Sequence, residues 1–118
     1  MNDSQYNQLI EDTLAAIEDA VEDLIQETDM DLDYESAGGI LTISLGVGGK
    51  LILNRQSPVQ QLWLAAKSGG YHLDWVETEA GGQWQTDRDG ESLNSLFNRV
   101  FKEQTGIEPN IQLSITAE

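Results

Sequence analysis

Four pairs of adjacent glycines divide the middle of the chain: Gly38-Gly39, Gly48-Gly49, Gly69-Gly70 and Gly81-Gly82. Adjacent glycines supply the backbone angles that tight hairpin turns require, and they disfavour helix. The segments that they border are short and apolar: 40–45, 50–55, 59–66 after Pro58, 71–76 and the residues around Trp84. Together with one further strand ahead of the first pair, this pattern predicts an antiparallel meander of about six strands within residues 31–86.

The further strand is predicted from Asp29 to Glu35, where carboxylates at odd positions alternate with Met30, Leu32 and Tyr34. An alternation with a period of two is typical of a half-buried strand. The same run resembles the start of an EF-hand loop, but such a loop needs glycine at its sixth position and glutamate at its twelfth. In this chain those positions hold Tyr34 and Ile40, which excludes an EF-hand.

Two amphipathic helices flank the strands. The first is predicted at about residues 4–27, because apolar side chains recur at spacings of three and four. These side chains are Tyr6, Ile10, Leu14, Ile17, Val21 and Leu24. The second is predicted at about 91–105, capped by Asp89 or Ser92 and ended by Gly106 and Pro109, with 107–118 as an extended tail. Its apolar stripe consists of Leu93, Leu96, Phe97, Val100 and Phe101.

Two such helices bury their stripes by lying side by side on one face of the sheet. We therefore predict an α+β fold, a two-layer sandwich, in a single domain spanning 1–118. The chain contains no cysteine, which excludes disulfides, thiolate metal sites and a cysteine nucleophile. It lacks an apolar run of the ~20 residues that span a bilayer and any pattern typical of a targeting sequence. We expect a cytoplasmic protein.

Charge is distributed very unevenly. The first 49 residues contain no lysine or arginine, while twelve carboxylates fall between Asp3 and Glu35. The nine remaining acids are accompanied by all six basic residues. A local negative field attracts cations and basic proteins, and it repels nucleic acid and anionic membranes. The N-terminal third is therefore the candidate site, the alternative being an acidic face that only keeps the protein soluble.

Along the first helix, acids repeat four residues apart and point away from the apolar stripe. Glu18 with Glu22 and Asp19 with Asp23 are two such pairs. Each like-charge pair at this spacing costs about 0.2–0.5 kcal/mol when no cation is present. Oxygen-rich sites of this kind suit hard cations. A bound cation would relieve the repulsion.

Four short motifs follow one another along the chain: Asn54-Arg55-Gln56-Ser57-Pro58, Gln61-Leu62-Trp63-Leu64-Ala65, Gly69-Gly70-Tyr71-His72 and Asp87-Arg88-Asp89-Gly90-Glu91. In order and spacing these motifs resemble the frataxin family, in particular its bacterial CyaY-type branch. The resemblance extends from residue 1 to about residue 113. It implies an iron-binding accessory protein of iron–sulfur cluster assembly that engages a cysteine desulfurase and a scaffold protein, and that is not itself an enzyme. It is expected to be a monomer, with metal-driven oligomers left open.

The carboxylates expected to bind metal are Glu18, Asp19, Glu22 and Asp23, followed by Glu11, Asp12, Asp29, Asp31 and Asp33. Binding is expected to be weak and poorly selective, so that Fe2+, Fe3+, Co2+, Mn2+ and lanthanides compete. For partner binding we select Asn54, Gln56 and Trp63. If Leu62 and Leu64 face the core, Trp63 stands on the open face of the sheet, where an exposed tryptophan is typical of a binding hot spot.

Two other functions remain open from the sequence alone. The acidic region could block a basic protein without any metal, by imitating the charge of nucleic acid. Alternatively, clustered carboxylates could oxidise and store iron, although that chemistry usually uses a bridged di-metal site inside a bundle. The single histidine, His72, is expected to be structural or part of the sheet surface. No phosphate-binding loop motif occurs, so nucleotide binding is not expected.

Overall fold

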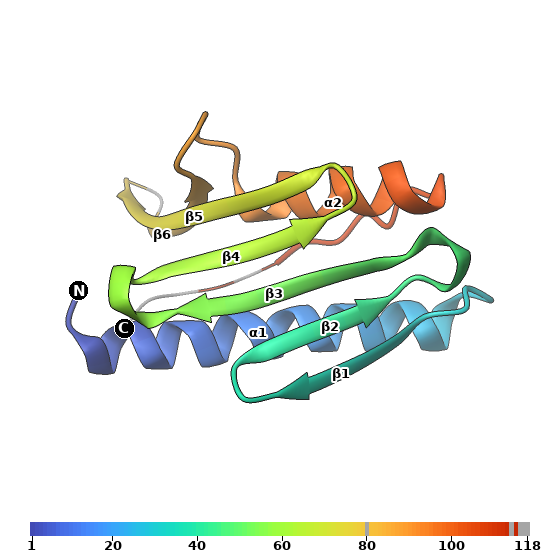
Figure 1. Ribbon diagram of the computed structural model, residues 1–118, viewed down its shortest axis with the longest axis horizontal. Helices are drawn as coiled ribbons and strands as arrows, with labels where there is room; N and C mark the ends of the chain where they lie inside the picture. The colour runs from blue at the N-terminus through green and yellow to red at the C-terminus, as the bar shows by residue number, and fades with distance from the viewer. Residues whose placement is uncertain (80, 114, 116–118) are drawn as a thin grey trace.

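The computed structural model describes residues 1–79, 81–113 and 115, and its elements follow the predicted order. In chain order they are α1 (Asp3–Glu27), β1 (Asp33–Ala37), β2 (Ile40–Ser44), η1 (Gly46–Gly48), β3 (Lys50–Gln56), η2 (Ser57–Val59), β4 (Gln61–Ala66), β5 (Gly69–Thr78), β6 (Gly81–Thr86) and α2 (Leu93–Thr105). The six strands form one sheet in the order β1-β2-β3-β4-β5-β6, with every neighbouring pair antiparallel. Both helices lie behind the same face of this sheet (Figure 1). The predicted α+β two-layer fold is confirmed.

Helix α1 begins with a capping box at Asn2. The Asn2 side chain accepts a hydrogen bond from the Gln5 backbone N–H at 2.8 Å, and the Gln5 side chain accepts one from the Asn2 N–H at 2.9 Å. These two contacts satisfy backbone donors that the first turn would otherwise leave free. The helix buries the predicted stripe, with Leu24 half-buried, and it also buries Leu9 and Thr13.

Thr13 connects α1 to the far end of the sheet. Its hydroxyl donates to the Leu9 carbonyl at 2.7 Å and accepts from the indole N–H of Trp84, on β6, at 2.9 Å. Both side chains are buried. A buried indole N–H without a partner costs about 1–3 kcal/mol, so the threonine hydroxyl allows the largest core side chain to lie beneath the helix.

The inner face of the sheet consists largely of leucines in register. Leu41 lies opposite Leu53, and Leu53 lies opposite Leu64, so the three leucines cross β2, β3 and β4 in one row. All three are at most 1% exposed. Because side chains alternate along a strand, this row directs Thr42, Asn54 and Trp63 to the opposite, open face.

The predicted start of the first strand is wrong by four residues. Strand β1 begins at Asp33, which pairs with Ser44, and Asp29 and Asp31 lie in the connection after α1. Leu32 explains the difference, because it is 8% exposed and its N–H bonds to the Met30 carbonyl at 3.0 Å. The chain turns inward to bury this leucine before it joins the sheet.

The C-terminal segment packs against the helices. Ile111 is 5% exposed, and the Asn98 side chain bonds to both its carbonyl and its N–H, at 2.9 and 2.8 Å. Asn94 accepts from the Leu113 N–H at 2.8 Å. The described part of the predicted tail forms neither helix nor strand, and Ile111 within it belongs to the core. The expectation for residues 114 and 116–118 lies outside the described part of the chain.

Candidate functional site

The acids of α1 line its solvent side, on the face opposite the core. Asp12, Asp19 and Asp23 are exposed, while Glu18 and Glu22 are half-buried. Their hydrogen-bond donors are neutral, since Gln8 donates to Asp12 at 3.0 Å and Gln26 donates to Glu22 at 3.2 Å. Among the residues that the structure describes, the ion pairs all join acids of the C-terminal half to His72, Arg99 or Lys102. Within the described residues, no lysine or arginine therefore forms an ion pair with an acid of α1, and Arg55, which reaches this helix, bonds to Asn7.

Strand β1 extends the negative surface around the edge of the sheet. Tyr34 lies opposite the buried Ile43, so it faces the helices, and its pKa is raised by burial and then by the charges of Glu22, Glu18 and Asp19. Asp33 and Glu35 therefore face the open side of the sheet. We call α1 together with residues 29–35 the acidic surface. Figure 1 shows α1 and β1 running side by side along one border of the molecule.

The acidic surface does not form a cage for a metal ion. Within residues 1–79, 81–113 and 115, no three His, Cys, Asp or Glu side chains converge closely enough to hold a metal. The predicted ligands are thus brought to one surface without being assembled into a site. Carboxylate oxygens remain suitable donors for hard cations, held through one or two carboxylates and water. The predicted metal-binding residues stay a prediction.

A second candidate surface surrounds Trp63 on the open face. Its strand neighbours Leu62 and Leu64 are 0% and 1% exposed, which confirms the predicted outward orientation of the indole. The ring stacks on the imidazole of His72, with centroids 4.1 Å apart and 12° between the planes. The indole N–H donates to the Gln61 side chain at 2.9 Å. The His72 ring and the Gln61 side chain therefore hold the indole of Trp63 in place.

Gln61 connects this tryptophan to two acids. Its amide nitrogen donates to Asp74 at 3.1 Å and to Asp87 at 3.4 Å, and His72 Nδ1 lies 3.9 Å from the Asp87 carboxylate. His72 is exposed on the sheet surface, one of the two placements expected from the sequence.

The other two selected residues lie on β3 beside Trp63. Asn54 pairs with Trp63 in the register and Gln56 pairs with Gln61. Both are half-buried. A shallow hollow beside them is lined by Ile52, Asn54, Trp63, Ala65 and His72. The structure thus brings the three predicted partner-binding residues together on one face.

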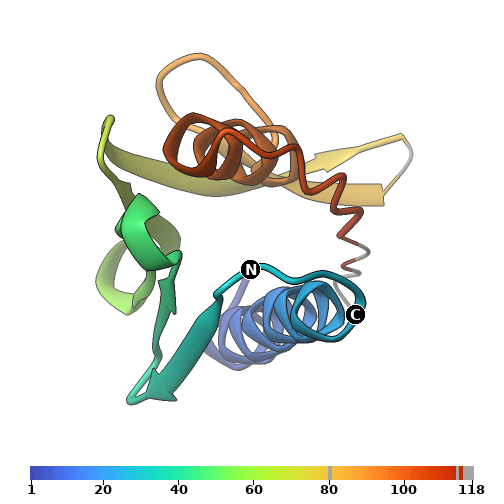
Figure 2. The same cartoon turned by 90° about the vertical axis from the view of Figure 1, so that its right-hand side faces the viewer.

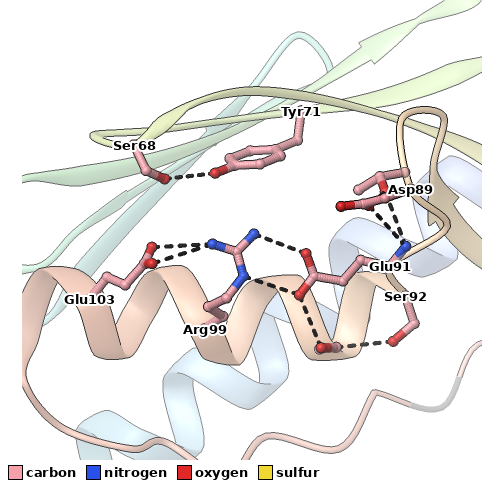
Figure 3. A network of polar contacts seen from close by, with 9 residues as sticks. Ser68, Tyr71, Asp89, Glu91, Ser92, Arg99 and Glu103 are labelled. Atoms are coloured by element: carbon pink, nitrogen blue, oxygen red, sulfur yellow. Dashed lines mark hydrogen bonds and ion pairs between the residues drawn. The ribbon is translucent and has the colours of Figure 1, made fainter.

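Arg99, on α2, contacts both the loop between β6 and α2 and the side chain of Tyr71 on β5 (Figure 3). The sequence patterns did not indicate this residue. Its guanidinium donates twice to Glu91, at 2.9 and 3.1 Å, and also to Glu103 at 3.3 Å. It lies over the Tyr71 ring, 5.5 Å from the centroid. The hydrogen bond from Arg99 lowers the pKa of Glu91. The four-residue spacing of Arg99 and Glu103 on one helix could have indicated the contact between these two residues. No such spacing indicates the pair of Arg99 with Glu91.

Neither helix that the structure describes has the length and apolar character needed to cross a membrane.

Comparison with known proteins gives a consistent result. A family model described as a frataxin-like domain matches residues 1–107. The chain is 45% identical to the iron-sulfur cluster assembly protein CyaY of Pseudomonas aeruginosa, over 90% of this chain and 93% of that protein. It is 43% identical to the protein of the same name from Azotobacter vinelandii, over 92% and 93% of the two chains.

Solved structures agree with these relatives. Frataxin from Psychromonas ingrahamii superposes with a TM-score of 0.69 at 29% identity, over 98% of this chain and 97% of that one. Trimeric frataxin from Saccharomyces cerevisiae, complexed with ferrous, has a TM-score of 0.68 at 24% identity, over 83% and 86%. At that identity the yeast protein supports the fold alone.

Proposed function

The chain belongs to the family of frataxin-like domains, and from this premise we propose that it binds iron weakly and regulates a cysteine desulfurase and its scaffold protein. A role in iron–sulfur cluster assembly follows from its CyaY relatives. The finer proposal has two parts. The acidic surface binds iron and docks on the desulfurase, and the open sheet face around Trp63 contacts the assembly complex. The protein acts as a regulator and carries out no chemistry of its own.

One observation carries the proposal: no lysine or arginine pairs with the acids of α1 within the described residues. Like charges along a helix are destabilising, so a surface of this kind costs stability unless a cation or a basic protein meets it. Nucleic acid and anionic lipid are repelled by the same field. A basic patch on the desulfurase is a partner of the required charge.

Iron in this proposal is a cargo or regulator that the protein holds and releases. Exposed carboxylates without a third converging ligand among the described residues favour weak and exchangeable binding. Such sites discriminate poorly between hard cations. Co2+, Mn2+ and lanthanides are therefore expected to compete with Fe2+ and Fe3+ for the acidic surface.

Desulfurase binding and cluster synthesis test the proposal. Glu18→Gln/Glu22→Gln removes two charges from the acidic surface, and Glu79→Gln/Glu108→Gln removes two exposed charges elsewhere. We expect the first variant to bind the desulfurase about tenfold more weakly at low salt and to lose its effect on the rate of cluster formation. The control should stay within about twofold of the unmodified protein. Equal loss in both variants would show that only net charge matters.

The absence of three converging ligands among the described residues favours one second candidate. In it, the acidic surface blocks a basic protein by charge alone and needs no metal. This candidate predicts that desulfurase binding is unaffected by a chelator and weakens smoothly with salt. Under the main proposal, added Fe2+ changes the affinity or the rate, and the chelator reverses that change.

A further inference from the structure

Three segments meet at the end of the molecule that faces the viewer in Figure 2: the connection after α1, the η1 turn and the C-terminal end of α2. Two apolar side chains are exposed there, Val47 completely and Ile107 at 48%. With Met30 and the buried Leu45 they line a groove, which we call the end groove. Scattered exposed apolar residues are common, but these side chains share one concave surface.

One side chain of α2, Gln104, fixes a wall of the end groove. The amide nitrogen of Gln104 donates to the carbonyls of Gly48 at 2.9 Å and Lys50 at 3.2 Å. Its oxygen accepts from the Lys67 N–H at 2.9 Å. These bonds fix α2 to the turns before β3 and before β5. A groove with fixed walls binds without the entropic cost of ordering them.

Charge around the end groove is polarised. Asp31 lines it, with Asp29 on the same connection and Asp33 at the start of β1, so this wall continues the acidic surface. Lys50 and Lys67 are bonded through their backbones to Gln104, which lines the groove from α2. A ligand with basic groups therefore has one favourable orientation, with those groups toward residues 29–33. The full chain carries a net charge of −15, which disfavours anionic lipid and a second copy of this chain.

We propose that the end groove receives a large apolar side chain from a partner segment whose neighbouring lysines or arginines contact Asp29, Asp31 and Asp33. The inference rests on the proposed function, because the same partner then covers the acidic surface of α1. The charges steer the encounter and weaken with salt. The apolar contact supplies the part of the affinity that survives at high salt.

The test compares two turns at opposite ends of the molecule. Val47, on η1, lines the groove, while Val59, on η2, is 56% exposed and distant from it (Figure 1). Desulfurase affinity is measured at low and high salt for Val47→Ser/Ile107→Ser and for the control Val59→Ser, after circular dichroism shows that both variants are folded. We expect the groove variant to bind about tenfold more weakly at high salt and the control to stay within about twofold.

Two outcomes separate this inference from the proposed function. If Glu18→Gln/Glu22→Gln weakens desulfurase binding while Val47→Ser/Ile107→Ser binds normally, the inference about the end groove is wrong. The proposed docking of the desulfurase on the acidic surface then still holds. If neither variant has an effect, the docking itself fails.

Two matched peptides then test, without the desulfurase, whether the groove binds an apolar side chain. One lysine-rich peptide carries a central leucine, and its match carries serine. The inference requires that only the leucine peptide shifts the methyl resonances of Val47 and Ile107. Equal binding without such shifts overturns it.

Discussion

The indole of Trp63 lies flat on the imidazole of His72, with ring centroids 4.1 Å apart and planes at 12°. The two residues are directly opposite each other on β4 and β5. A tryptophan fixed in this way loses little rotamer entropy when a partner covers it. The open face of the sheet therefore presents a rigid aromatic surface.

Replacing Trp63 should affect binding much more than folding. Because the side chain is only half-buried and lies on the open face of the sheet, we expect Trp63→Ala to change the free energy of unfolding by less than about 1 kcal/mol. Affinity for the desulfurase–scaffold complex should fall more than about tenfold. Isothermal titration calorimetry and urea unfolding measure the two effects. Val76→Ala, an exposed apolar position on β5, is the control. Similar affinities for both variants would contradict the role of Trp63.

The ion pair between Glu91 and Arg99 should contribute to stability only above acid pH. Arg99 lowers the pKa of Glu91 from its ordinary value of 4.5. A carboxylate with a lowered folded pKa stabilises the protein above 4.5, and this contribution disappears as the pH falls through the lowered value. We expect Glu91→Gln to cost about 1 kcal/mol at pH 7.

Urea unfolding of Glu91→Gln and the unmodified protein from pH 7 into the acid range checks this expectation. The difference in unfolding free energy should shrink toward zero as Glu91 is protonated. Protonation of the acidic surface affects both proteins equally, so it cancels in the difference. Glu108→Gln, which removes the more exposed pair with Lys102, should show a smaller effect. A difference that is constant with pH would contradict the assignment.

The C-terminal segment should matter for stability. Ile111 is 5% exposed and fixed by Asn98. We expect Ile111→Ala to lower the free energy of unfolding by about 2–4 kcal/mol, the usual cost of emptying a buried isoleucine site. Gln112→Ala, at the exposed neighbouring position, should change it by less than about 0.5 kcal/mol. Equal melting temperatures for the two variants would show that this segment is not part of the core.

The elements of the fold could be predicted because each carries a local pattern. The four- and three-residue spacing of Ile10, Leu14 and Ile17 fixes the buried side of α1, and Gly38 and Gly39 mark the first hairpin. Tertiary packing, which local patterns do not reveal, determined where the first strand begins. Leu32 is drawn into the core and delays β1.

The candidate sites were predictable to different degrees. The alternation around Trp63 gave its orientation, because Leu62 and Leu64 had to face the core. The stacking of His72 and the contacts of Gln61 depend on the register of β4 with β5 and on the turn after β6. The end groove joins residues such as Val47 and Ile107 that are far apart in the chain, so no local pattern marks it.

Divalent cations should stabilise the protein through the acidic surface. Binding to the native state alone raises the melting temperature, so millimolar Co2+ should raise that of the unmodified protein. Glu18→Gln/Glu22→Gln should be more stable without metal by about 0.2–0.5 kcal/mol and should gain less from Co2+. Differential scanning fluorimetry with and without a chelator measures both. If Co2+ leaves the melting temperature of the unmodified protein unchanged, this result would contradict metal binding at the acidic surface.

The most direct test of the acidic surface is a titration with Co2+ or Fe2+ followed by amide NMR spectra, because a paramagnetic ion broadens the signals of nuclei close to it. If the ion is held by the carboxylates of α1 and the following segment, signal loss will be confined to residues 11–35. Losses scattered over the chain, or centred on His72, would contradict the account.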